Sequence, residues 1–398
     1  MSRSTAKFLP YARHQILSED YRAVADVLGS DHLAQGPEAG HFERALGQVT
    51  GSAFCASVSS GTAALHLALK ALGVGSGDEI IVPVCTFVAT ANAVVLCGAV
   101  PVFADVEADT QNLCPEEVAR KIGPRTKGAI AVHFAGHPAD MDALRSALGG
   151  GGFLLEDACH ALGAWFHNRS VGCLGEAACF SFHPAKLITT GEGGAITTNS
   201  EAINAKVRRL REHGIERKLE QFQGLGLPDP LRAEELGAWV YELHDVAPNY
   251  RLGEIAAALG RSQLTHMEAW LARRKAIVDA YQKALAHLEV LELSHERPNV
   301  RSAWHLFAIR LRLECLTVGR AQIFQELRAR GIGVQVHYIP VHLQPYYRKI
   351  LGTRFGDCPT AEDIYLRSLS LPLFPAMQDA DVDRVVETLT SLLRRYRR

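Results

Sequence analysis

Two residues in this chain have side chains and surroundings suited to covalent chemistry. Lys186 follows an apolar run that ends at Ser181, and its close neighbours are apolar as well. A lysine near a strand is most often a solvated surface charge, but burial among apolar groups favours the neutral, nucleophilic amine. Asp157 ends the apolar run 153–157 (FLLED), where a carboxylate is often a helix cap. At the carboxyl end of a buried strand it would instead face a ligand crevice.

A third group of residues has the form of an anion site. The segment 59–63 (SSGTA) precedes a stretch with helical periodicity, and Ser181 adds a further hydroxyl. A Ser/Thr pair here is commonly an ordinary N-cap, but the N-terminus of a helix also binds phosphate. An amine, a carboxylate and a phosphate site together are the parts needed to hold pyridoxal phosphate (PLP), in which the carboxylate keeps the pyridine nitrogen protonated.

The elements that position these residues follow from hydrophobic periodicity. Short apolar runs alternate with helical patterns from about residue 50 to 200, which predicts an α/β domain with a largely parallel sheet. Several runs are apolar on both faces, as strands covered by helices on both sides are. The predicted strands are 79–83, 101–106, 129–136, 153–158, 178–182 and 195–199, and the predicted helices are 61–73, 87–97, 115–122 and 140–148.

The second half of the chain is predicted to form a smaller domain. A polar segment broken by Gly and Pro at 216–236 indicates a surface loop, and 254–288 is expected to be a helical link. We expect two domains, 1–265 and 266–398. The second is predicted to contain strands at 305–313 and 333–340 and helices at 320–330 and 380–395.

Composition excludes several classes of function. The 398 residues carry a net charge of −1, which gives no electrostatic basis for binding nucleic acid or an anionic membrane. No apolar run reaches the roughly 18–20 residues of a membrane span, and the nine cysteines contain no CxxC pair. We therefore expect a soluble, cytoplasmic protein with reduced thiols. His133 and His137 have the spacing of a helical metal site but fall on a predicted strand and turn, so no metal is expected.

Three longer motifs carry a resemblance to a known family. They are EDACHALGA (156–164), SFHPAKLITTGEGG (181–194) and APNYRLGEIAAALGRSQL (247–264). Together they resemble the DegT/StrS-type nucleotide-sugar aminotransferases. The resemblance implies the aspartate-aminotransferase-like fold (PLP fold type I), with a large α/β domain and a smaller α+β C-terminal domain. It also implies that Lys186 forms the covalent link to PLP and carries protons between substrate and cofactor.

The same resemblance implies roles for other residues. Phe87 would stack on the pyridine ring, and His160 would lie beside it. Asn249 would reach the PLP phosphate of a neighbouring subunit, and Arg251 would meet the amino donor's carboxylate, which makes a homodimer with shared active sites. The implied cofactor-binding set is Gly61, Thr62, Ala63, Phe87, Asp157, His160, Ser181, Lys186 and Asn249, and the substrate-binding set is His183, Arg251, His337 and Tyr338, with His305 and His342 as further candidates.

The substrate is suggested by the C-terminal motifs SAWHLFAIRL (302–311) and GIGVQVHYIPVHLQPYYRK (331–349). These are most similar to aminotransferases of pseudaminic acid biosynthesis. The resemblance implies transfer from L-glutamate to C4 of a UDP-linked 4-keto-6-deoxy-N-acetylhexose, giving UDP-4-amino-4,6-dideoxy-N-acetyl-β-L-altrosamine. One alternative is another nucleotide-sugar 4-aminotransferase, of the perosamine, bacillosamine or legionaminic type. The other is an inactive PLP-fold sensor or binding protein, against which the intact Lys186, Asp157 and Ser181 argue.

Overall fold

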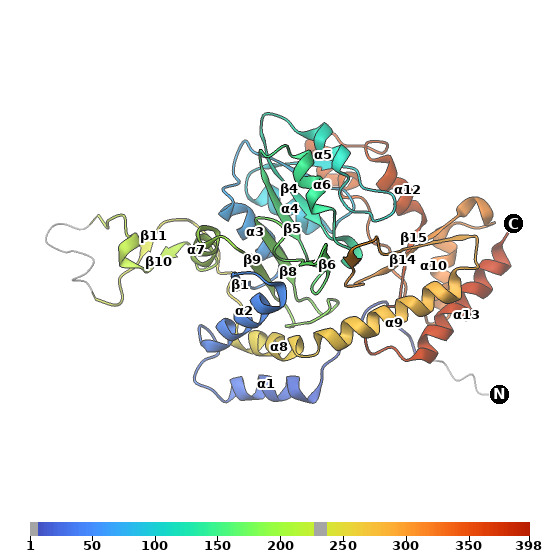
Figure 1. Ribbon diagram of the computed structural model, residues 1–398, viewed down its shortest axis with the longest axis horizontal. Helices are drawn as coiled ribbons and strands as arrows, with labels where there is room; N and C mark the ends of the chain where they lie inside the picture. The colour runs from blue at the N-terminus through green and yellow to red at the C-terminus, as the bar shows by residue number, and fades with distance from the viewer. Residues whose placement is uncertain (1–6, 227–236) are drawn as a thin grey trace.

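A seven-stranded sheet forms the centre of the molecule (Figure 1). The computed structural model describes residues 7–226 and 237–398. The strand order is β1-β9-β8-β5-β4-β2-β3, and only β9 runs against the others. The prediction of a largely parallel sheet is therefore confirmed. The strands are β1 (Phe54–Val58), β2 (Glu79–Pro83), β3 (Val100–Ala104), β4 (Thr126–Val132), β5 (Phe153–Asp157), β8 (Ala177–Ser181) and β9 (Gly194–Thr198).

The strands are apolar on both faces because helices cover both faces. In β2, Ile80 and Val82 face one core while Ile81 faces the other, as the two-residue period of a strand requires. The first core is closed by α3 (Gly61–Ala71), α4 (Val88–Leu96) and α7 (Glu201–Leu210). The second is closed by α2 (Pro37–Thr50), α5 (Pro115–Lys121), α6 (Met141–Ala147) and α8 (Glu254–Leu264).

The topology brings chemically active residues to one edge of the sheet. Parallel strands end at a common edge, where ligands bind in α/β folds. Asp157 ends β5, Ser181 ends β8, and the chain leaving β1 enters α3 at Gly61. The strand β1 was not predicted, because its short FCASV run carries weak alternation.

A second sheet and a set of helices form the C-terminal part. The sheet has the order β12-β14-β15, from β12 (Leu291–Leu293), β14 (Phe307–Leu311) and β15 (Ser368–Leu371), all antiparallel. Its core is closed by α9 (Met267–Leu285), α10 (Arg320–Ala329) and α13 (Asp379–Tyr396). The shorter helices α11 (Pro345–Leu351) and α12 (Pro359–Arg367) pack on the large sheet's side.

One sequence prediction in this half is refined and one is wrong. The segment 254–288 is helical as predicted, but it is divided into α8 and α9 by a tight turn in which the Thr265 N–H donates to Ser262 O. The predicted strand 333–340 makes only one bridge, between Gln335 and Ser370. Instead, the consecutive residues 335–339 line a cavity, while Val334 lies in the core.

Other parts of the chain lie outside these sheets. A hairpin of β10 (Ile215–Glu216) and β11 (Glu242–Leu243) projects from the body of the molecule (Figure 1). Of the predicted loop 216–236, residues 227–236 lie outside the described residues, and 216–226 contain the end of β10 and one short 3-10 turn at Leu219–Gln221. Within the described residues, no helix combines the length and the hydropathy required to span a membrane.

Candidate active site

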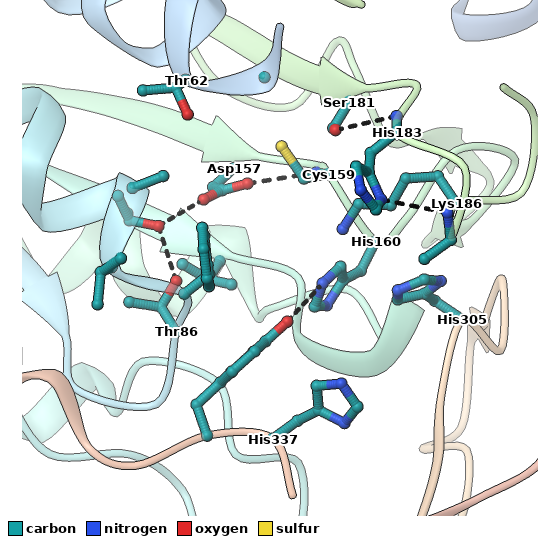
Figure 2. A pocket seen from close by; sticks show the side chains of 18 of the residues that line it. Thr62, Thr86, Asp157, Cys159, His160, Ser181, His183, Lys186, His305 and His337 are labelled. Carbon is teal, nitrogen blue, oxygen red and sulfur yellow. Dashed lines mark hydrogen bonds between the residues drawn. The ribbon is translucent and has the colours of Figure 1, made fainter. Parts of the chain in front are cut away.

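The carboxyl edge of the large sheet borders a cavity of about 630 Å³ (Figure 2). Most of the predicted site residues line it together, although they come from distant parts of the sequence. They are Gly61, Thr62, Phe87, Asp157, His160, Ser181, His183, Lys186, His305, His337 and Tyr338. Four others are not part of its lining in this chain: Ala63, Asn249, Arg251 and His342.

Lys186 lies in the turn that follows β8. Its backbone N–H donates to His183 O at 2.8 Å, which fixes the turn and directs the side chain toward the cavity. Burial lowers the pKa of the Lys186 amine, and the nearby Cys159 and Asp157 oppose this only in part. A lowered pKa increases the fraction of neutral amine, the form that adds to a carbonyl.

Asp157 is buried at the end of β5 and is held by donors on both oxygens. Thr90 Oγ1 on α4 donates to Oδ2 at 2.7 Å, and the Cys159 N–H approaches Oδ1 at 3.3 Å. Thr90 is itself bonded to Thr86 at 2.7 Å. No lysine or arginine in residues 7–226 and 237–398 forms an ion pair with Asp157. The carboxylate is therefore available to a cationic group of a ligand.

The N-terminus of α3 forms a small cup at the far end of the cavity from His305 and His337 (Figure 2). The Ser60 hydroxyl accepts the Ala63 N–H at 3.1 Å, so the predicted donor Ala63 is occupied by the N-cap. The Gly61 position is tightly packed, because a Cβ there would lie 2.8 Å from Ser181 Cβ. Gly61, Thr62 and Ser181 thus bring backbone and hydroxyl donors close together at the positive end of a helix.

Histidines line the opposite wall. The rings of His160 and His305 lie 4.3 Å apart, and His160 Nε2 is 3.3 Å from the Tyr338 hydroxyl. Burial lowers the pKa of His160 and His305 well below the usual value, and lowers that of His337 to about 4. Burial also raises the pKa of Tyr338. All four groups are therefore neutral at pH 7.

Asn249 and Arg251 contact other parts of their own chain. Arg251 pairs with Glu212 at 3.3 Å, and Asn249 Oδ1 accepts the Arg251 N–H at 3.3 Å. The Tyr250 carbonyl accepts the Ser59 N–H at 2.8 Å, which ties this segment to the turn before α3. The segment adjoins the cup without lining the cavity of its own chain.

Several lining residues were missed by the sequence reasoning. Thr86 precedes α4 and Thr90 lies in its first turn, and a Ser/Thr pair near the start of a helix is too common to indicate a site. The others carried no local signal, because they reach the cavity only through tertiary folding. The remaining missed residues include Tyr11, Cys159, Glu192, Gln335 and Gln344.

The donor set fits PLP. The cavity combines a buried amine, a buried carboxylate without a cationic partner in the described chain, and a cup of backbone and hydroxyl donors. The cavity also exposes an aromatic face at Phe87, which is 57% accessible despite its apolar ring. Each of these features matches one part of the cofactor: the aldehyde, the ring nitrogen, the phosphate and the ring face.

Comparisons with known proteins agree with this geometry. Residues 14–390 match the DegT/DnrJ/EryC1/StrS aminotransferase family. The spore coat polysaccharide biosynthesis protein SpsC of Bacillus subtilis is 38% identical over 97% of this chain and 97% of its own length. Helicobacter pylori PseC, an aminotransferase involved in the biosynthesis of pseudoaminic acid, is 29% identical with a TM-score of 0.89, covering 98% of this chain and 100% of PseC.

A further structure bears on the cofactor. Spr1654 of Streptococcus pneumoniae, assigned as a sugar aminotransferase and solved in its PMP form, has a TM-score of 0.89 and 29% identity over 97% of this chain and 99% of its own. The predicted PLP fold, cofactor and enzyme class are thereby confirmed. This chain belongs to the DegT/DnrJ/EryC1/StrS aminotransferase family and is a PLP-dependent sugar aminotransferase.

Proposed function

We propose that the protein transfers the amino group of L-glutamate to C4 of a UDP-linked 4-keto-6-deoxy-N-acetylhexose. The product is UDP-4-amino-4,6-dideoxy-N-acetyl-β-L-altrosamine, an intermediate in pseudaminic acid biosynthesis. The observation that carries the chemistry is the joint placement of Lys186 and Asp157 in one cavity. The substrate choice is supported by the C-terminal motifs and by the overall similarity to PseC.

Lys186 is the proposed catalytic residue. Bound PLP supplies an electrophilic carbon and a ring that takes up the electron pair released at the substrate carbon. Lys186 first holds the cofactor covalently and, once displaced by glutamate, removes the α-proton of the donor through its neutral Nζ. In the second half-reaction, Lys186 delivers a proton to C4 of the sugar. Its lowered pKa suits both directions of transfer near pH 7.

The other residues are proposed to bind and orient. Asp157 keeps the pyridine nitrogen protonated, Phe87 and His160 flank the ring, and Gly61, Thr62 and Ser181 surround the phosphate, while Ala63 stabilises the cup through its N–H bond to Ser60. His183, His337 and Tyr338 contact the sugar nucleotide, and two residues act on the neighbouring subunit of a homodimer: Asn249 at the phosphate and Arg251 at the carboxylate of glutamate. The nine free cysteines suit the reducing cytoplasm that we propose as its location.

A substrate panel tests the assignment. Purified enzyme with L-glutamate is offered UDP-, GDP- and dTDP-linked 4-keto sugars, and the product is identified by NMR. We expect the UDP-linked 4-keto-6-deoxy-N-acetylhexose to have the highest kcat/KM. Equal or better turnover of a GDP- or dTDP-sugar would overturn the substrate assignment and favour a perosamine-type or related 4-aminotransferase, an alternative that the similarity to SpsC keeps open.

The role of Lys186 is tested separately. Lys186→Ala and Lys186→Arg should both lose the visible absorbance of covalently held PLP, and amino transfer should fall by at least about 10³-fold, because no neutral amine remains. Arginine keeps a cation at the position and so controls for charge alone. Transfer at more than a tenth of the wild-type rate in either variant would remove Lys186 from the mechanism.

A further inference from the structure

A buried arginine behind the cavity has no acidic partner. Arg274 on α9 is 1% exposed, and no carboxylate within residues 7–226 and 237–398 lies within ion-pair distance of it. Its Nη1 instead faces three backbone carbonyls, those of Trp304 and His305 at 3.3 Å and of Leu373 at 3.0 Å. A buried charge without a counter-ion is unfavourable, and an apolar side chain of similar volume would pack at lower cost. The guanidinium therefore requires an explanation beyond packing.

The carbonyls that it binds belong to a strained segment. Trp304 has φ of 45°, in the left-handed region that a bulky residue rarely adopts. This conformation persists only where surrounding contacts impose it. Arg274 binds the two consecutive carbonyls of Trp304 and His305, and it connects them to Leu373 on the chain beyond β15. One side chain thus fixes a turn that the sequence would not otherwise favour.

The same turn is clamped to the large sheet. Ala303 N–H donates to Gly136 O at 3.0 Å, and Leu306 N–H donates to Ala135 O at 3.2 Å. A Cβ at Gly136 would lie 2.8 Å from Trp304 N and 2.9 Å from His305 N. The segment is therefore in backbone contact with the 3-10 turn Phe134–Gly136 that follows β4, and the His305 side chain lines the cavity.

His305 in turn contacts the ring that we place beside the cofactor. Its imidazole lies 4.3 Å from that of His160, with the ring planes at 36°, and both rings are more than nine-tenths buried. The Nδ1 atoms of both rings are buried without a hydrogen bond in the described chain. The His160 ring is located by the stack on His305, by the 3.3 Å approach to the Tyr338 hydroxyl and by an edge contact with Phe134 at 6.2 Å between centroids. The stack on His305 is the closest of these ring contacts.

We propose that Arg274 is a positioning residue of the active site: it holds the 304–305 turn so that His305 supports His160 beside Lys186. The proposal rests on the proposed function, which places His160 against the cofactor. Arg274 itself lines no part of the cavity. It acts through two carbonyl contacts and one ring stack, from the helix that leads into the C-terminal part.

A double-mutant cycle in the holoenzyme tests the proposal. The variants are Arg274→Met, His305→Phe and the double variant, with Arg273→Met as the matched control. Arg273 is the adjacent residue on α9, and it binds Met377 O and Asp379 rather than the 304–305 turn. Three quantities are measured: kcat/KM for L-glutamate, the dissociation constant of PLP, and the pH at which the visible absorbance of bound PLP changes.

We expect Arg274→Met and His305→Phe each to lower kcat/KM by about 10- to 100-fold, the scale of a misplaced active-site group. Both should shift the spectral transition in the same direction. The double variant should be no worse than the poorer single variant, because both act on one unit. Arg273→Met should match the wild type in all three quantities.

Other results would overturn it. Additive losses, or an Arg274→Met enzyme with the wild-type spectral transition and kcat/KM, would reduce Arg274 to a structural residue. If Arg274→Met does not fold, Arg274→Gln, which removes the charge and shortens the side chain, is compared with His305→Phe by the same measurements, and a wild-type spectral transition and kcat/KM in it refute the positioning role. A wild-type protein that neither binds PLP nor reacts with L-glutamate would instead refute the proposed function.

Discussion

At the scale of single residues, the site depends on one hydrogen bond that the sequence did not reveal. Asp157 was predicted as the partner of the pyridine nitrogen, but its orientation is set by Thr90, whose hydroxyl donates at 2.7 Å. A carboxylate that must face a ligand needs such a donor on its other oxygen, because a free rotation about χ2 would misdirect it. Thr90 is therefore expected to matter for the reaction, although it contacts no reacting atom.

Substitutions at Asp157 and Thr90 separate the effect of the carboxylate's charge from the effect of its orientation. Asp157→Asn should lower kcat by about 10²- to 10³-fold, because the neutral amide cannot keep the pyridine nitrogen protonated. Thr90→Val should cost about 1.5–3 kcal/mol, the value of a hydrogen bond to a charged group, or roughly 10- to 100-fold in kcat. Thr90→Ser keeps the hydroxyl and is the control. Steady-state kinetics with L-glutamate decide the matter, and a Thr90→Val enzyme equal to Thr90→Ser would exclude the orienting role.

At the scale of elements, we expect PLP binding to be most sensitive to added side-chain volume at the start of α3. Gly61→Ala would place a Cβ 2.8 Å from Ser181 Cβ and 3.2 Å from Cys159 Sγ. Overpacking of about 1–3 kcal/mol at the cup should raise the dissociation constant of PLP by about 10- to 100-fold. Gly75→Ala, where a Cβ meets nothing within 4 Å, is the control. Fluorescence titration of the apoenzyme measures both, and unchanged affinity in Gly61→Ala would place the phosphate elsewhere.

The sequence predicted the elements of the large domain more successfully than those of the C-terminal part. Strands buried on both faces, such as β4 and β5, give continuous apolar runs that cannot be mistaken for surface segments. The segment 333–340 alternates as a strand does, yet it bonds the sheet only at Gln335. The segment passes from the core at Val334 to the cavity wall at 335–339, and the local sequence pattern cannot distinguish this from a strand.

Local sequence patterns also predicted only part of the site. Lys186, Asp157 and Ser181 were found because they stand beside strong strand patterns. Gln335 and Gln344 line the cavity but carry no local signature, since only tertiary folding brings their segment to the sheet edge. The domain boundary at 265–266 remains a proposal. It is supported by the break between α8 and α9 and by a separate core around α9, α10 and α13.

At the scale of the whole molecule, the buried histidines couple stability to pH. In the folded protein the pKa of His337 is about 4, below the 6.5 of an unfolded chain. The unfolded state therefore binds more protons between these values, so the stability is present above pH 6.5 and is lost as pH falls toward 4. His160 and His305 act with the same sign.

Urea unfolding of the apoenzyme at pH 7 and pH 5 measures this effect. Each such histidine contributes about 1.4 kcal/mol per pH unit, so His337→Gln should reduce the loss of unfolding free energy between the two pH values by about 2 kcal/mol. His295→Gln, at an exposed position, controls for the removal of a histidine. Equal losses in wild type and His337→Gln would contradict the prediction.

The proposed sharing of sites between subunits is also a property of the assembly. Lys186→Ala and Asn249→Ala chains are each expected to form inactive or weakly active homodimers. Random mixing gives about one half heterodimers, each with one of two sites intact, so about a quarter of wild-type activity should return. Refolding a mixture and assaying transfer tests this, and no gain over the separate variants would place Asn249 in the site of its own chain.

The long helix α9 has a mechanical consequence. Its 19 residues, Met267–Leu285, extend about 28 Å from the break at Thr265 and His266. Over that length, a tilt of about 10° at the break would move the far end of α9 sideways by roughly 5 Å. The cavity has walls from both the large sheet and residues 335–339 and 344. We expect a change in the angle at this joint to change the distance between these walls. Arg274 lies about two helical turns from this joint, so a tilt of α9 moves Arg274 much less than it moves the far end of the helix.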